Sequence, residues 1–177
     1  VKHYYLPVDG TTAVATAAVS SGSIDQIFIS TNGSKYNETP TVTISGDGQD
    51  ATAEAFLVNI TLSGGSPVSS AVIRAVVKEG EIRSINIVDG GAGYDEDRVS
   101  VVVSAPDNPG RMAQLIPTFT SGTLTGLNIV NGGSGYRSVK LVDITNAGTG
   151  YTSATVAFTS APVGISGSFT VPETVTG

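Results

Sequence analysis

Apolar residues occupy every second position along three segments of the chain, which begin at Ala13, Ala71 and Ala113. Side chains two positions apart point to the same face of a β-strand. The pattern therefore predicts three strands, each with one buried face and one mixed face. No stretch carries apolar residues at helical spacing over three turns, so we expect little helix.

A second apolar segment follows each of these strands after a short turn that contains Gly22, Gly80 or Gly122. Glycine supplies the positive φ that tight hairpin turns demand. In each second segment the apolar residues are spaced three and then two positions apart, which predicts a β-bulge in each strand. The bulges are expected at Asp25-Gln26, Arg83-Ser84 and Thr125-Gly126.

A glycine-rich loop that ends in tyrosine follows each second strand. The copies are Ile29–Tyr36, which lacks the last glycine, Ile87–Tyr94, Ile129–Tyr136 and a further copy, Ile144–Tyr151. In the first three copies the turn glycine lies fourteen positions before the tyrosine, and the first alanine of the unit lies nine positions earlier still. We predict a tight turn whose glycine backbone is covered by the tyrosine ring, with the hydroxyl in water or capping a carbonyl.

A third apolar segment follows the tyrosine loops at 41–44, 99–103 and 155–158. This order predicts an all-β fold of tandem three-stranded antiparallel meander repeats that form small β-sandwich-like modules. The expected segments are an N-terminal arm or linker (1–12), β-repeat 1 (13–62), β-repeat 2 (63–109), β-repeat 3 with an inserted 15-residue duplication (110–162), and a C-terminal strand or tail (163–177).

Three segments fall outside the simple repeat. Ala51–Val58 copies the alternating strand and is expected to form a hairpin with Ala71–Val77. The 15-residue duplication is expected to add a short strand around Leu141–Ile144. Ile165–Val171 either begins a further unit or reaches a neighbouring molecule as a strand.

The composition excludes several classes of partner. The 177 residues include no Cys and carry a formal net charge of −6. An acidic chain lacks the basic surface that neutralises phosphates, so we expect no nucleic-acid partner. No apolar run is long enough for a membrane helix, so we expect no membrane insertion. The chain begins with Val, which suggests processing or a longer parent protein.

Two loop types were candidates for ligand binding. Gly-Gly-x-Gly resembles a phosphate-binding loop, but such loops precede a helix and here a strand follows. The carboxylates of Ser45–Asp50 and Tyr94–Asp97 suit calcium, yet neither segment has the ligand spacing of a known calcium loop. We therefore expect solvated turn acids and no metal or cofactor.

Catalysis is not expected either. His3 is the only histidine and lies near the end of the chain, so no Ser-His-Asp set can be assembled. The acids that could form a paired-carboxylate site lie at predicted turns, where acids usually only meet solvent; they are Glu79, Glu81, Asp95, Glu96 and Asp97. We predict no enzyme activity and assign no catalytic residue.

A sugar-stacking row of tyrosines is the last candidate. It would use Tyr4, Tyr5 and the loop tyrosines, but one tyrosine at the same place in each repeat indicates packing.

The loop Asn131-Gly-Gly-Ser-Gly-Tyr136, with its flanking Ile-x-Ile strand, resembles glycine-and-tyrosine repeats of phage virion proteins, notably of phages of marine cyanobacteria. The resemblance covers about residues 13–162. It implies a structural component of a tail, baseplate, fibre or capsid decoration, located in the virion and assembled with other virion subunits or with its own copies. Two alternatives remain open: a cell-surface or extracellular assembly protein (adhesin, S-layer or filament subunit), and a carbohydrate-binding or hydrolytic accessory module.

Overall fold

The computed structural model describes residues 9–159. This part of the chain holds twelve strands in small antiparallel sheets, no α-helix, and one turn of 3-10 helix, η1 (Glu96–Arg98). The predicted all-β class with small β modules is confirmed. The expectations for His3, Tyr4, Tyr5 and the 163–177 tail lie outside the described residues.

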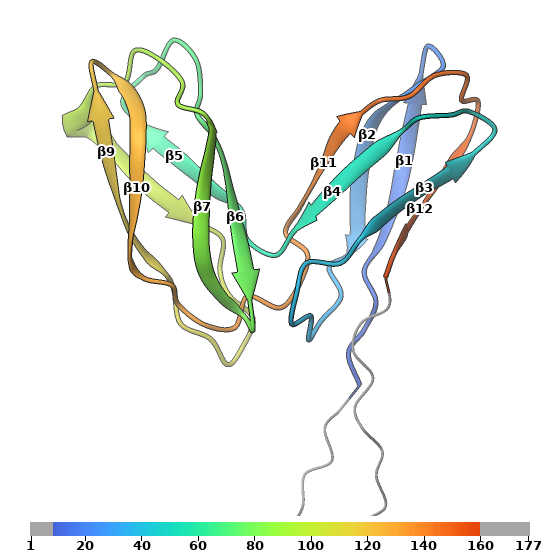
Figure 1. Cartoon of the computed structure of the whole chain (residues 1–177), viewed down its shortest axis with the longest axis horizontal. Helices are drawn as coiled ribbons and strands as arrows, with labels where there is room; N and C mark the ends of the chain where they lie inside the picture. The colour runs from blue at the N-terminus through green and yellow to red at the C-terminus, as the bar shows by residue number, and fades with distance from the viewer. Residues whose placement is uncertain (1–8, 160–177) are drawn as a thin grey trace, which may run out of the picture.

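The strands form two lobes side by side along the long axis (Figure 1). The terminal lobe contains β1 (Val14–Ser20), β2 (Ser23–Thr31), β3 (Val42–Gly46), β4 (Thr52–Phe56), β11 (Leu141–Asn146) and β12 (Ala154–Phe158). The inserted lobe contains β5 (Ile60–Gly64), β6 (Val72–Lys78), β7 (Glu81–Asp89), β8 (Val99–Val103), β9 (Gln114–Thr120) and β10 (Thr123–Asn131). The chain leaves the terminal lobe after β4 and returns before β11, so the lobes are nested, and segments 13–62 and 110–162 each contribute strands to both.

Three long hairpins have the predicted glycine turns: β1–β2, β6–β7 and β9–β10. In each turn both central residues have positive φ, for example 51° at Ser21 and 79° at Gly22. Two-residue turns of this kind match the right-handed twist of the strands. The pairing registers skip Asp25, Arg83 and Thr125, so the three predicted bulges are confirmed.

A fourth hairpin is assembled from segments far apart in the sequence. β4 pairs with β11, from Leu141 opposite Phe56 to Asn146 opposite Thr52. The strand expected around 141–144 is therefore present, but the expected hairpin of 51–58 with 71–77 is wrong. β6 already has β7 as its partner through a two-residue turn, and closing so short a loop costs little entropy. β4 instead pairs with β11, which is a copy of a second strand but has no first strand directly before it in the sequence.

The third strand of a unit does not pair with its second strand. β3 pairs with β12, which also pairs with β1, and β8 pairs with β5. Each tyrosine loop is still hydrogen-bonded beside the start of the first strand, as at Ser134 and Arg111. The chain therefore leaves the hairpin there and continues into a strand that pairs with a different unit of its lobe.

The buried core residues occupy equivalent positions in the sequence repeats. In each long hairpin, the first apolar residue of the second strand is almost fully buried. These residues, together with Val139 at the equivalent position before β11, have at most 2% of their surface exposed: Ile24, Ile82, Leu124 and Val139. Burying such a side chain contributes about 1.5–3 kcal/mol. Small residues such as Ala15, Ala75 and Ala113 line the facing strands, so the layers pack closely.

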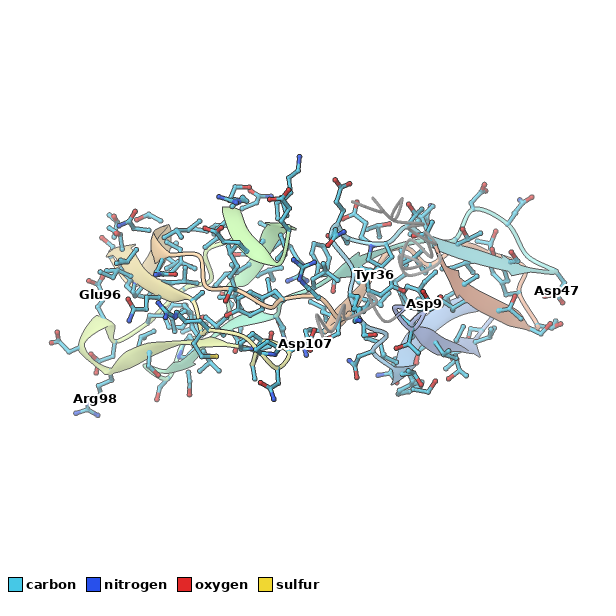
Figure 2. The ribbon with its side chains drawn as sticks, turned by 90° about the horizontal axis from the view of Figure 1, so that it is seen from below. Asp9, Tyr36, Asp47, Glu96, Arg98 and Asp107 are labelled. Carbon is cyan, nitrogen blue, oxygen red and sulfur yellow. The ribbon has the colours of Figure 1, made fainter. Side chains whose placement is uncertain are left out.

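Polar and charged groups join the two lobes. The Arg137 guanidinium contacts the Asn37 amide oxygen and donates to the Glu79 carbonyl at 2.9 Å. Asp107 accepts from the Arg137 amide (3.1 Å), the Ser138 hydroxyl (2.6 Å) and the Lys140 ammonium (3.1 Å). Figure 2 shows Asp107 and Tyr36 near the middle of the long axis, with Asp47 at one end and Glu96 and Arg98 at the other.

A second bridge between the lobes uses one arginine. Arg74 of β6 forms an ion pair with Asp143 of β11. Its guanidinium carbon lies 5.3 Å from the centre of the Phe56 ring, within the range of a cation–π contact. The inserted lobe is therefore held at several points besides its two connections.

The junction can be tested by Asp107→Ala. The change removes three hydrogen bonds at a half-buried site, and we expect it to lower the free energy of unfolding by about 1 kcal/mol and to broaden the range of lobe orientations. Urea denaturation measures the first effect and small-angle X-ray scattering the second. Asp97→Ala, at an exposed carboxylate of η1, is the control. Equal scattering profiles for the two variants would contradict the role assigned to Asp107.

Candidate functional site: the tyrosine loops

The four tyrosine loops share one backbone conformation. The glycine three residues before each tyrosine has φ between 63° and 69°; these are Gly33, Gly91, Gly133 and Gly148. The residue just before the tyrosine also has positive φ, including Lys35 at 61° in the copy that lacks this glycine. The divergent first loop therefore keeps the fold of the others.

Close backbone contacts explain the invariable glycine. A Cβ on Gly133 would lie 2.5 Å from the Arg111 carbonyl oxygen and 2.7 Å from the Ala113 nitrogen. The Gly133 amide donates to the Asn131 side-chain oxygen at 2.8 Å, and equivalent bonds join Gly91 to Asp89 and Gly148 to Asn146. These amides are already engaged, so they are not directed at a phosphate.

The loop tyrosines lie in the interior, with 0–6% of their surfaces exposed. The Tyr136 ring covers Gly133, as predicted: its Cε2 atom is 2.9 Å from the place a Cβ would take. The predicted bond from the hydroxyl to a carbonyl is present at Tyr36, which donates to the Thr159 carbonyl at 3.4 Å, but a bond from a backbone amide to the hydroxyl was not predicted. The Ala113 amide donates to the Tyr136 hydroxyl at 2.8 Å, and the same bond joins Ala13 to Tyr36 (2.9 Å) and Ala71 to Tyr94 (2.7 Å). Each of these amides lies directly before a first strand, outside the hydrogen bonds that join the two strands of the hairpin. The tyrosine hydroxyl provides its acceptor.

The fourth loop rests on β4 in the same way. A Cβ on Gly148 would meet the Gln49 oxygen at 2.5 Å and the Ala51 nitrogen at 2.7 Å. Gln49 and Thr149 exchange backbone hydrogen bonds of 2.9 and 3.0 Å. Ala51 thus occupies the place that Ala13, Ala71 and Ala113 hold in the other units.

Each loop of the inserted lobe docks on the other hairpin of that lobe. The Tyr94 amide donates to the Gly122 carbonyl (2.9 Å), and the Leu124 amide donates back to the Gly90 carbonyl (3.0 Å). The reciprocal pair joins Tyr136 to Gly80 (3.1 Å) and Ile82 to Gly132 (3.0 Å). The two hairpins therefore hold each other by exchanging loops.

The terminal lobe repeats this exchange with one substitution. Tyr151 donates to the Gly22 carbonyl at 3.0 Å, as in the other lobe. Tyr36, however, donates to the Arg137 carbonyl at 3.0 Å. Arg137 stands where a turn glycine would close the β4–β11 hairpin, and its side chain reaches the inserted lobe instead.

The first calcium candidate, Ser45–Asp50, is tied to β12. The Asp47 carboxylate accepts from the Thr152 hydroxyl and from the amides of Thr152 (3.0 Å) and Ser153 (3.1 Å). These bonds, with the Thr152 hydroxyl first, hold the pKa of Asp47 well below its usual range. Asp47 thus fixes the loop between β3 and β4 to the start of β12.

The remaining candidate acids lie at two separate places. Asp95 pairs with Arg98 at 3.3 Å, and the Gly122 amide donates to Glu96 at 3.1 Å. Glu79 and Glu81 lie at the β6–β7 turn, at the opposite end of the inserted lobe (Figure 1), where Glu81 pairs with Arg83 at 3.0 Å. Among residues 9–159, no three acidic or histidine side chains come together in a way that could hold a metal ion.

The residues of the lobe junction were missed in the sequence. Arg137 lies fifteen positions after Gly122, the same offset that separates Tyr151 from Tyr136, and this spacing was a usable signal. Asp107 lies in a segment without a repeat counterpart, and Asp143 lies in the 15-residue duplication, where its counterpart is Asn128. Nothing in their local sequence indicates a partner in the other lobe.

No protein-family model matches the chain, and no curated protein or solved structure gives a significant match. The part of the chain that the structure describes has no helix long and apolar enough to cross a membrane. The role of the tyrosine loops is therefore inferred from their geometry.

The glycine requirement is tested by Gly133→Ala. The added Cβ collides with backbone atoms and the residue must keep φ near 69°, so we expect a loss of about 2–4 kcal/mol in unfolding free energy. Gly126→Ala in the same unit is the control, since its Cβ would meet nothing closer than 3.4 Å. Urea denaturation compares the two. A loss below about 0.5 kcal/mol for Gly133→Ala would contradict this account.

The hydroxyl contact is tested by Tyr136→Phe. The change leaves the buried Ala113 amide without its acceptor, which should cost about 1–3 kcal/mol in urea denaturation. Tyr151→Phe is the control, because the hydrogen bonds described for residues 9–159 include none at the Tyr151 hydroxyl. Equal losses for both variants would show that the ring alone matters.

The same variant tests a pH effect. Burial raises the pKa of the Tyr136 hydroxyl above its usual 10.0, so the folded chain favours the neutral form. The resulting stability is complete below the unfolded pKa and is lost as pH rises through the folded value. Stability of Tyr136→Phe should therefore fall less steeply than wild type above about pH 10.

Proposed function

We propose that the chain is a non-enzymatic structural component of a virus particle, in a tail, baseplate, fibre or capsid decoration. It works by assembling with its own copies or with other virion proteins. The observation that carries the proposal is the reciprocal docking of the tyrosine loops. Every copy of the most distinctive motif joins one repeat to another, so the repeated sequence serves construction.

The state of the candidate chemical groups supports a non-enzymatic role. Three of the acids considered for catalysis, Glu81, Asp95 and Glu96, each engage a neighbouring amide or arginine, and they lie at opposite ends of the inserted lobe. A paired-carboxylate mechanism needs two acids converging on one substrate. Their local contacts instead stabilise turns and loop docking.

Exposed apolar side chains on the strands support contacts with neighbours. Those more than half exposed include Phe28 on β2, Ile116 on β9 and Val130 on β10. The last two line the same open groove. Grouped apolar surface of this kind is typical of an interaction site.

The choice of virus particle over cell surface follows the resemblance of the tyrosine loops to phage virion repeats. A cell-surface or extracellular assembly protein would use the same docked loops and is the alternative. The carbohydrate-binding alternative has less support, because the four loop tyrosines are buried and their rings are not free to stack on a sugar.

The proposal is tested by locating the chain in the culture that produces it. We expect quantitative mass spectrometry to find it at a fixed ratio to the major proteins of purified virus particles, and immunogold labelling to mark one part of the particle. Recovery in the envelope fraction of uninfected cells would favour the cell-surface alternative. Recovery only as a free monomer, outside both fractions, would refute an assembly role.

A further inference from the structure

An open groove of about 350 Å³ runs between β8 and β9 in the inserted lobe. The side chains that line it are apolar apart from Gln114, and they include Val101 and Val103 of β8 with Leu115 and Ile116 of β9. No charged side chain lines it. Its chemistry therefore suits an apolar, uncharged segment.

The same place in the terminal lobe is closed. There β12, which follows the Tyr151 loop, pairs with β1, with Ala15 opposite Val156. In the inserted lobe β8 follows the Tyr94 loop and β9 is the counterpart of β1, but these two strands belong to different sheets. One edge of β8 is consequently unpaired within the described residues.

Pro117 explains the difference between the lobes. It stands on β9 where β1 has Ala17, opposite Leu127 of β10. Pairs in an antiparallel ladder alternate between hydrogen-bonded and non-hydrogen-bonded. If the pair next to the turn, Thr120 and Thr123, is hydrogen-bonded, the alternation places Pro117 and Leu127 in a non-hydrogen-bonded pair. The nitrogen of Pro117 therefore faces away from β10 toward β8, and it has no hydrogen to donate. β8 therefore lacks the partner on β9 that β12 has on β1.

One segment of the sequence fits this groove. Residues 163–171 lie between Pro162 and Pro172 and carry no charge. Val163, Ile165, Gly167, Phe169 and Val171 occupy alternate positions, and glycine, serine and threonine stand between them. The pattern is that of a strand with one apolar face, and its nine residues equal the length of β10.

The position of the segment in the chain favours a second copy as its source. Thr159 donates to the Thr41 carbonyl at 3.0 Å in the terminal lobe. Only three residues separate it from Val163, and four extended steps span about 14 Å. Figure 1 shows β9 on the side of the inserted lobe away from the terminal lobe.

We propose that residues 163–171 of one copy bind the groove between β8 and β9 of a second copy as an added β-strand, hydrogen-bonded to the free edge of β8. Strand addition of this kind combines main-chain hydrogen bonds with pockets for alternate side chains. Each copy has one groove and one segment, so the contact is head-to-tail and joins copies in series. The inference rests on the proposed assembly role and names the contact that serves it.

The groove is tested on the full chain by sedimentation velocity over a range of concentrations. Wild type should associate reversibly, and Ile116→Asp and Phe169→Asp should each weaken association at least about tenfold, since each places a charge in an apolar contact. Val88→Asp is the matched control, because Val88 on β7 is the counterpart of groove residue Val130 and both are more than half exposed. Circular dichroism checks that the variants fold. A monomeric wild type, or equal weakening by Val88→Asp, would overturn the proposal.

A cross-linking experiment distinguishes a second copy from the same chain. The chain has no Cys, so Gln114→Cys chains can be mixed with differently tagged Ser168→Cys chains under mild oxidation. A mixed disulfide supports the contact, and Val14→Cys in place of Gln114→Cys should give none because β12 covers that edge of β1. A bridge found only inside a double variant would place the segment in its own groove and overturn the second-copy contact.

The two proposals can fail separately. A chain that remains in virus particles when Ile116→Asp is introduced keeps its structural role but loses this contact. A chain that associates through the groove but is absent from particles keeps the contact and loses the proposed location.

Discussion

The structure depends on one contact, in which a buried tyrosine covers a left-handed glycine and, in three of four units, accepts the first amide of a strand. The glycine lets the loop backbone approach to a distance that a Cβ would forbid. The hydroxyl pairs an amide that would otherwise be buried without a partner. With the loop fixed in this way, its tyrosine amide and glycine carbonyl face the turn of another hairpin. The loop geometry therefore presents the same docking groups in the units.

Docking in reciprocal pairs explains why a chain with so little charge and so many glycines holds a core. A single hairpin cannot bury both of its faces, but two hairpins that exchange loops cover each other's first core residue, such as Ile82 and Leu124. The terminal lobe forms the same pair even though one of its hairpins is split. Because Arg137 provides the carbonyl of the missing turn, its side chain is free to reach the inserted lobe and join the two pairs.

The lobes share this scaffold and differ where a third strand meets a first strand. Alanine at position 17 is compatible with the pairing of β1 with β12, whereas Pro117 removes a donor from the corresponding edge of β9. The same scaffold thus yields one continuous four-stranded sheet and one open groove. One residue at a strand edge therefore accompanies the difference between a paired edge in one lobe and an open groove in the other.

The sequence by itself determined the local features: the alternating strands, the glycine turns, the bulges opposite Ala18, Val76 and Thr118, and the covered glycine of each loop. These depend on contacts within about 25 residues and on backbone conformations open mainly to glycine. Tertiary structure alone decided the pairing of β4 with β11 and the partner of each third strand. It also decided the bond from a backbone amide to the tyrosine hydroxyl, and the bond from the Arg137 amide to the Asp107 carboxylate. Alternating strands are nearly interchangeable as partners, so local pattern does not rank them. Which pair forms depends on loop closure, on docking of loops from other units, and on the edges that remain free.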